Sequence, residues 1–497
     1  MFTGSETPII ATVVLVALGI LGWGFYRARP FGKLGILAWL QSVVLMTPWL
    51  VFFGLFAAGI YVNIAGVLLL LVLSVGLYIF IGRKLRDLGQ DTILKQKATQ
   101  RIAEESKYTE SSSERTSSSQ SDQPLQIASI PEEDLSLIRE IFGIDTFFTT
   151  ETIPYQEGAI FKGNLRGEAQ KTHDSLTARL QERLNDKYRL FLVNSADGKP
   201  VVIVLPKRND PRPMTLAQKI FGVILFLATI ATTMEASGLL LRFDFFNSPE
   251  RYLEVLPLAT GILLVLIVHE VGHWILARRY NIRLSLPYFI PSIQIGSFGS
   301  ITRFESLLPN RQALFDIAIA GPLVGGVTSL IMLITGLILS HPGSLFQLPG
   351  EFFKGSILVG TLAKLVLGSA LKSSLVDVHP LVIIGWVGLI ITALNLMPAG
   401  QLDGGRIIQA VYGRKIAGRT TIATLIILGL VSLGNPLAIY WAIVILFLQR
   451  DLERPSLNEV TEPDDTRAAL CLLALFLMII ILIPLTPGVA GRLGIGS

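Results

Sequence analysis

The 497-residue chain has very little cysteine and little charge. Its one cysteine, Cys471, allows neither an intramolecular disulfide nor a cysteine-rich metal site. Charged residues make up only 16% of the chain, whereas soluble globular domains contain about 25%. Hydrophobic residues reach 51% and are gathered into long runs. These values exclude an ordinary soluble protein and indicate a chain built around membrane-spanning segments.

The chain also lacks the features of a nucleic-acid-binding protein. Its net charge is +5, but the basic residues form no stripe with interleaved aromatic residues. We therefore expect no nucleic-acid partner and assign the excess positive charge to cytoplasmic loops. No internal repeat is found in the sequence. A transporter built from two repeated halves with paired broken helices is therefore disfavoured.

Long apolar runs predict about ten transmembrane helices, because a span needs about 20 mostly apolar residues. The runs cover residues 8–26, 38–58, 64–81, 215–236, 255–277, 315–339, 381–396, two short spans within 420–447, and 468–485. With this count, the basic clusters at 27–33, 83–86, 207–219, 278–283, 406–419 and 450–454 fall on one side, which the positive-inside rule makes the cytoplasmic side. Arg242 and Arg251 fall on the other side, together with Asp244 and Glu250. The run at 356–371 has Lys364 in its middle, so we expect a re-entrant or interfacial helix there.

Composition divides the chain into five regions. Residues 1–86 are expected to form a three-helix membrane region, 87–130 a disordered Ser-rich linker, 131–212 a soluble α+β domain, 213–419 a membrane core and 420–497 the C-terminal transmembrane helices. Within the soluble region, helical periodicity covers 132–142 and 169–184, and apolar runs flank the Asp197-Gly198 turn. The expected fold class is a polytopic α-helical membrane protein with a small α+β soluble domain inserted after the third span.

The run at 255–277 contains an H-E-x-x-H motif formed by His269, Glu270 and His273. Residues four apart lie on one face of a helix, so both histidines can bind one metal ion, and Glu270 can take a proton from a zinc-bound water. In a soluble helix the pattern can be an ordinary polar face. In lipid, ionisable side chains are costly, so the motif indicates a catalytic metal site in a membrane helix.

A catalytic zinc ion needs a third protein ligand, and Asp403 is the only acidic residue at the end of the run 381–396. It lies in the stretch N-L-M-P-A-G-Q-L-D-G-G at 395–405. Pro398 breaks the helix, and the glycines are expected to give the backbone freedom that lets the carboxylate turn toward the metal. The alternative is that Asp403 is a solvated residue in a helix cap and turn.

Together, H-E-x-x-H in one membrane helix and N-x-x-P-x-x-x-L-D-G in a later one resemble the site-2 protease family, the intramembrane zinc metalloproteases of peptidase family M50. The resemblance covers residues 255–419 or so. It implies that His269, His273 and Asp403 bind Zn²⁺, that Glu270 is catalytic, and that Asn395 contacts the substrate or the transition state.

Three further segments are similar to parts of that family. The segment G-P-L-V-G-G at 321–326 resembles a family element on the intervening helix, and its small residues favour close helix packing over a catalytic role. The loop 281–310 resembles a membrane-embedded β-hairpin, which could take up a substrate strand by β-augmentation; the alternative is a plain surface loop. The soluble region, with G-N-L-R-G at 163–167, is similar to the ethylene-dependent gravitropism-deficient and yellow-green branch of chloroplasts and cyanobacteria.

The resemblance implies regulated intramembrane proteolysis, with membrane-protein substrates and the lipid bilayer as partners. Three leading spans without a transit peptide would suit a bacterial member of this branch, in the plasma or thylakoid membrane of a cyanobacterium or a related cell. The basic flanks predict that the soluble domain lies in the cytoplasm. A catalytically silent scaffold or chaperone of the same fold is the alternative, because some relatives in this branch lack the zinc motif. The presence of all four site residues favours an active enzyme. The sequence indicates neither a particular substrate nor an oligomeric state.

Overall fold

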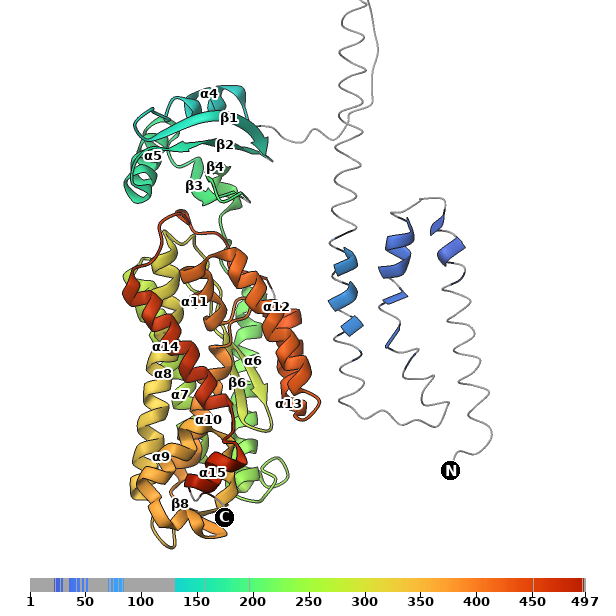
Figure 1. The fold of residues 1–497 in the computed structure, drawn as a ribbon, viewed down its shortest axis with the longest axis vertical. Coiled ribbons are helices and arrows are strands. Elements are labelled where there is room, and N and C mark those ends of the chain that lie inside the picture. The colour runs from blue at the N-terminus through green and yellow to red at the C-terminus, as the bar shows by residue number, and fades with distance from the viewer. Residues whose placement is uncertain are drawn as a thin grey trace, which may run out of the picture. The chain divides into compact units, whose positions relative to one another are not determined.

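The structure is a computed structural model that describes residues 130–497, apart from 156, 196, 450, 494, 496 and 497, and scattered positions between 22 and 84 (Figure 1). The predicted Ser-rich linker and most of the three predicted N-terminal spans therefore lie outside the described residues. The chain divides into two units, Met1–Pro124 with Leu425–Leu448 and Leu125–Thr424 with Gln449–Ser497. The second unit contains the soluble domain and all the predicted site residues, and it is described by itself below.

The soluble domain is a four-stranded antiparallel sheet packed on two helices (Figure 1). The strands are β1 (Phe147–Tyr155), β2 (Gly158–Leu165), β3 (Tyr188–Asn194) and β4 (Pro200–Pro206), in the order β1-β2-β4-β3. The helices are α4 (Glu132–Arg139) and α5 (Ala169–Leu184). Side chains from both layers, such as Phe161, Leu176 and Leu192, are fully buried between them. Both predicted helices and the β3–β4 hairpin are present.

Strands β1 and β2 were not predicted from the sequence. β1 is an edge strand in which only Phe147 is buried, so its sequence, F-F-T-T-E-T-I-P-Y, shows no clean alternation of apolar and polar residues. An alternating pattern arises only where one face of a strand is buried along its whole length.

Four helices in the described part of the chain are long and apolar enough to cross a membrane. They are α6 (Leu216–Leu240), α7 (Tyr252–Arg279), α8 (Arg311–Leu339) and α14 (Asp465–Leu482). Further helices are α10 (Pro380–Asn395), α11 (Asp403–Tyr412), α12 (Arg414–Val431), α13 (Pro436–Val444) and α15 (Pro487–Leu493). The polytopic helical fold agrees with the prediction, whereas the count of ten spans stays a prediction.

The ambiguous run at 356–371 forms α9 (Ile357–Leu367) and a 3₁₀ turn, η5 (Gly368–Lys372). At 1.5 Å per residue, the 11 residues of α9 extend about 16 Å, roughly half the thickness of the hydrocarbon core. This helix is too short to span, as the sequence predicted. Beside it, β7 (Phe346–Pro349) pairs with β8 (Leu375–Val378).

Glycines bring the central helices into close contact. A Cβ atom on Gly272 of α7 would lie 2.6 Å from the carbonyl oxygen of Ala320 on α8, and one on Gly385 of α10 would lie 2.4 Å from the backbone nitrogen of Leu333 on α8. No side chain fits at such contacts, so only glycine allows these backbones to approach. α8 is therefore held between α7, which contains the H-E-x-x-H motif, and α10, which leads to Asp403.

The predicted hairpin in the loop 281–310 is present. Its strands, β5 (Tyr288–Ser292) and β6 (Gly296–Ile301), pair antiparallel. β5 packs against α6, and β6 lies close to α6, α7 and α10. The hairpin therefore lies beside the helices that contain the predicted site residues.

An extended segment at 451–461 joins the soluble domain to the membrane helices, and we call it the docking segment. Along the outer edge of β3, the backbone nitrogen of Leu192 donates to the carbonyl oxygen of Leu457 at 2.7 Å. The next residue, Asn458, donates its backbone N–H to the carbonyl oxygen of Pro309 at 3.0 Å, just before α8 begins. The docking segment thus hydrogen-bonds to the soluble domain and to the start of α8.

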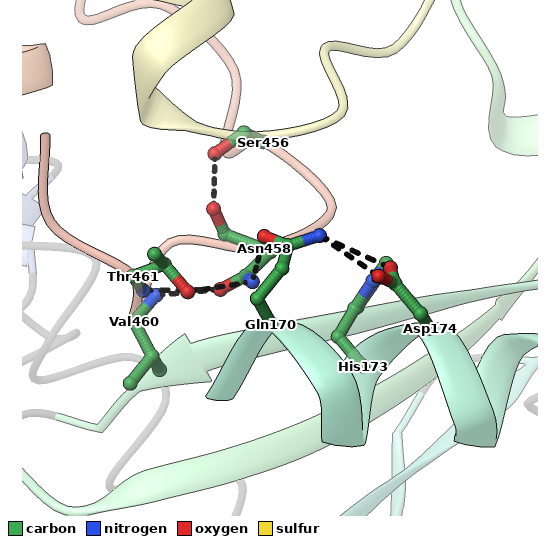
Figure 2. A network of polar contacts seen from close by, with 7 residues as sticks. All are labelled: Gln170, His173, Asp174, Ser456, Asn458, Val460 and Thr461. Atoms are coloured by element: carbon green, nitrogen blue, oxygen red, sulfur yellow. Dashed lines mark hydrogen bonds and ion pairs between the residues drawn. The ribbon is translucent and has the colours of Figure 1, made fainter. Parts of the chain in front are cut away.

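Asn458 lies at the centre of this junction and is fully buried (Figure 2). Its Nδ2 donates to Oε1 of Gln170 on α5 at 3.0 Å and to Oγ1 of Thr461 at 2.8 Å. Its Oδ1 accepts from the backbone nitrogens of Val460 and Thr461, both at 3.1 Å. Gln170 in turn donates to the Asp174 carboxylate. Because a buried amide is costly unless paired, this network favours one docked position of the domain.

Candidate active site

The three predicted metal ligands converge in the structure. His269 and His273 lie one turn apart on α7, and Asp403 is the first residue of α11. Oδ2 of Asp403 is 3.2 Å from Nε2 of His269 and 3.4 Å from Nε2 of His273, and the two Nε2 atoms are 3.1 Å apart. Ligand atoms around one tetrahedral zinc ion, each 2.0–2.1 Å from the metal, lie about 3.3 Å from one another. The separations therefore suit one metal ion bound by all three side chains.

The hydrogen bond of His273 identifies which ring nitrogen faces the cluster. Nδ1 of His273 is 2.7 Å from the carbonyl oxygen of Ile317, which can only accept, so Nδ1 carries the hydrogen. In the neutral form of the ring, the lone pair of Nε2 then faces Asp403 and His269. A cation would stabilise lone pairs and a carboxylate gathered in this way. Metal-binding histidines usually donate their other N–H to such a carbonyl oxygen, so the donor set fits zinc.

Glu270 lies beside the metal position but is held by other groups. Its carboxylate comes within 4.8 Å of the nitrogens of both histidines. Oε1 accepts a hydrogen bond from the hydroxyl of Ser300, and Oε2 accepts one from the hydroxyl of Thr302 at 2.7 Å. Because Asp403 contacts both histidines directly, it is the better candidate for the third ligand. Glu270 remains as the candidate base.

Sequence reasoning missed Ser300 and Thr302. They lie two residues apart, at the end of β6 and just beyond it, so both side chains point to one face of the extended chain. The sequence feature that could have indicated them is the Ser-x-Thr pair in the hairpin expected beside the H-E-x-x-H helix. Nothing in the sequence indicated which face of the hairpin would meet Glu270.

Asp403 is brought to the histidines by a turn and by close backbone packing. A Cβ atom on Gly404 would lie 1.9 Å from the carbonyl oxygen of Leu396, and one on Gly405 would lie 2.3 Å from that of Gly400. Neither Gly404 nor Gly405 has a positive φ, whereas Gly400 has a φ of 49°. The predicted backbone freedom is therefore found at Gly400, one of the glycines of this stretch, and not at Gly404 or Gly405. Those two glycines permit close contact.

Asn395 lies at the end of α10 and is buried. It lines the same small cavity as Glu270, His273 and Asp403. A Cβ atom on Gly299 of β6, where φ is 106°, would lie 2.4 Å from Nδ2 of Asn395, so the hairpin passes directly beside this amide. All five predicted site residues are thus gathered around one site.

Comparison with known proteins agrees with this geometry. Residues 257–433 match the profile of peptidase family M50, and residues 136–211 match that of the EGY3 middle domain. The probable zinc metalloprotease EGY2, chloroplastic, of Arabidopsis thaliana is 40% identical over 377 residues, which cover 73% of this chain and 67% of that protein. The corresponding EGY1 protein of Arabidopsis thaliana is 38% identical over 402 residues, which cover 73% of each chain. The chain belongs to peptidase family M50.

This membership confirms the predicted site-2 protease family and its EGY branch. The M50 match begins within α7 and ends beyond α12, so it includes both motifs. The EGY3 middle-domain match falls within the soluble α+β region. No solved structure matches the chain significantly.

Arg406 has a role in the M50 core that was not predicted from the sequence. It follows a predicted span among basic residues that are expected on the cytoplasmic side, and its side chain is buried. Oε2 of Glu453 lies 3.1 Å from Nε of Arg406 and 2.9 Å from its Nη2. The same Nη2 donates a hydrogen bond to the carbonyl oxygen of Thr302 at 2.7 Å. Arg406 thus ties α11 to the strand that contacts Glu270.

The predicted small-residue element on α8 packs against the metal ligands themselves. A Cβ atom on Gly321 would lie 2.2 Å from Nε2 of His273, and one on Gly325 would lie 3.1 Å from Cβ of His269. Close packing was predicted, but its location against the ligand rings was not. These glycines leave room for the imidazole rings.

Substitution of Gly321 by Ala is expected to displace the His273 ring and lower zinc affinity by about 10- to 100-fold, as loss of a supporting contact usually does. Gly326→Ala is the matched control, because its Cβ would meet only the Thr392 methyl group, at 3.3 Å. Metal analysis after dialysis against graded chelator measures the effect. Equal zinc retention by both variants would show that Gly321 does not position His273.

Proposed function

We propose that this chain is an intramembrane zinc metalloendopeptidase that hydrolyses peptide bonds of membrane-embedded substrate proteins. The observation that supports it most directly is the convergence of His269, His273 and Asp403 beside Glu270. The two histidines and Glu270 lie on a helix apolar enough to span the bilayer. Buried ionisable groups at such positions are costly and mark function.

His269, His273 and Asp403 would hold the zinc ion, which when bound supplies Lewis acidity to the site. Glu270 acts as general base, taking a proton from the attacking water and giving it to the leaving amine. The hydroxyls of Ser300 and Thr302 orient its carboxylate so that this proton transfer starts from a fixed geometry.

Asn395 is proposed to contact the substrate or the transition state, since its amide lines the cavity between β6 and the metal ligands. The β5–β6 hairpin is proposed to take up an extended substrate segment by strand addition. Because Ser300 belongs to this hairpin and binds Glu270, a substrate strand paired there would lie near the base.

The region boundaries at 86, 130, 212 and 419 and the count of about ten spans are part of this proposal. So is a bacterial location, in the plasma or thylakoid membrane of a cyanobacterium or a related cell. The Arabidopsis relatives are named chloroplastic, which is compatible with a photosynthetic membrane. A catalytically silent scaffold remains the competing function, and it lacks a specific observation in its favour.

The soluble domain is expected to lie on the cytoplasmic side, on the opposite side of the membrane from the end of α8. α8 starts beside the docking segment, and its 29 residues extend about 44 Å, more than the hydrocarbon core. With Cys471 replaced, single cysteines at the exposed positions Asp197 and His341 should react from opposite faces of sealed vesicles. Labelling of both from the same face would contradict the proposed topology.

A further inference from the structure

Gln449 is a buried residue of the active-site cavity to which the proposed mechanism gives no role. It is 2% exposed and lines the cavity together with Glu270, Asn395 and Asp403. Its Oε1 is buried and has no hydrogen-bond partner within the described part of the chain. An unpaired buried amide destabilises the folded state, so its presence at this position calls for an explanation.

The backbone around Gln449 is anchored to the active site. Its carbonyl oxygen accepts a hydrogen bond at 3.0 Å from the backbone nitrogen of Gln401, two residues before Asp403. It ends a π-helical turn, Ile445–Gln449, and such turns often occur at functional sites. Beyond it, Glu453 pairs with the buried Arg406. The backbone on both sides of the Gln449 side chain is therefore anchored to the loop and helix around Asp403.

The chemistry of this side chain suits a peptide backbone. A carboxamide offers two N–H donors and a carbonyl acceptor, which are complementary to the C=O and N–H groups of an extended polypeptide. The amide of Asn395 lines the same cavity. We propose that Gln449 is a substrate-binding residue that hydrogen-bonds the polypeptide backbone next to the scissile bond. This assignment rests on the proposed function.

The chain contains a matched residue for comparison. Gln409 is also 2% exposed and also has an unpartnered Oε1. However, its Nε2 donates to the carbonyl oxygen of Glu453 at 3.1 Å, and it does not line the cavity. Gln409 is therefore expected to support the fold, whereas Gln449 is expected to bind substrate.

Two zinc-binding probes separate these roles in the full-length, zinc-loaded protein. Acetohydroxamate chelates the metal alone, whereas a peptidyl hydroxamate chelates the metal and also presents a peptide backbone. Gln449→Leu should weaken the peptidyl hydroxamate about tenfold, the effect of losing one well-formed hydrogen bond. It should leave acetohydroxamate binding within about twofold of wild type. Gln409→Leu should leave both affinities within about twofold of wild type.

Thermal unfolding gives a second, independent readout. Gln449→Leu should leave Tm unchanged or raise it, because an unpaired buried amide is removed. Gln409→Leu should lower Tm, because the hydrogen bond to Glu453 is lost. Gln449→Met, with its flexible side chain, provides a second variant if leucine packs poorly.

Unchanged peptidyl hydroxamate binding in Gln449→Leu and Gln449→Met would overturn the assignment. So would equal weakening of both probes, which would place the effect on the metal ligands. Failure of the wild-type protein to bind either probe is a distinct outcome. It would refute the proposed metalloprotease function, and the role of Gln449 with it.

Discussion

Replacement of Glu270 by Gln is expected to lower kcat by about 10²- to 10⁴-fold while the protein keeps its zinc, because a general base acts on the chemical step. Glutamine has nearly the same shape as glutamate but cannot accept the proton from water. His269, His273 and Asp403 are unchanged, so metal binding should persist. Cleavage of a panel of single-span membrane proteins in liposomes, together with metal analysis of the same samples, measures both quantities.

Glu235→Gln is the matched control for this experiment. Glu235 is a buried carboxylate in another spanning helix, and its Oε2 accepts hydrogen bonds from the backbone nitrogens of Phe245 and Phe246, at 2.9 and 3.1 Å. Its replacement should lower Tm and leave turnover per folded molecule near wild type. If Glu270→Gln cleaves as fast as wild type, Glu270 is not the base. If the wild-type protein cleaves no substrate beyond those cleaved by Glu270→Gln, the silent scaffold becomes the better hypothesis.

The candidate ligands could be predicted from the sequence because their signals are local. The spacing of His269 and His273 depends only on the helical period, and the apolar run around them predicts the helix. Asp403 stood out as the acidic residue after a helix broken by proline. Its contact with the histidines, however, depends on α8 packing between α7 and α10. That packing is allowed by glycines such as Gly272, which lies against the backbone of α8. The local sequence around Gly272 does not indicate which helix it will contact.

The contacts that support the site could not be predicted, because their partners are far apart in sequence. Arg406 pairs with Glu453, 47 residues away, and donates to the carbonyl of Thr302, 104 residues away. Without those partners, an arginine after a span resembles an ordinary cytoplasmic charge. The docking contact between Gln170 and Asn458 crosses 288 residues, so no local signal indicated it. Long-range pairing of polar residues was the main information missing from the sequence.

Replacement of Asp403 by Ala is expected to lower zinc affinity by more than about 100-fold, because loss of a ligand costs more than loss of a supporting contact. The wild-type protein should contain about one zinc ion per chain. His269→Ala and His273→Ala should show the same loss, since each removes one of three ligands. Metal analysis of detergent-purified protein measures the stoichiometry.

Asp316→Asn and His173→Ala are the controls, because they replace an aspartate and a histidine that are not proposed to bind zinc. Asp316 is partly buried on α8 and accepts hydrogen bonds from Arg467 at 2.7 Å, and His173 is buried in the soluble domain. Both variants should lose stability but keep zinc, because neither side chain lines the cavity around Asp403.

Thermal unfolding with and without a chelator tests the same ligands through stability. Zinc that binds only the folded state stabilises it by RT ln(1 + [L]/Kd), so the wild-type Tm should fall when metal is removed. The Tm of Asp403→Ala should be insensitive to chelator at the same zinc concentration, because its weakened site is empty in both conditions. Asp316→Asn should start from a lower Tm and still respond to chelator as wild type does. Full zinc content in both His269→Ala and Asp403→Ala, with a wild-type response to chelator, would mean that the metal site lies elsewhere in the chain.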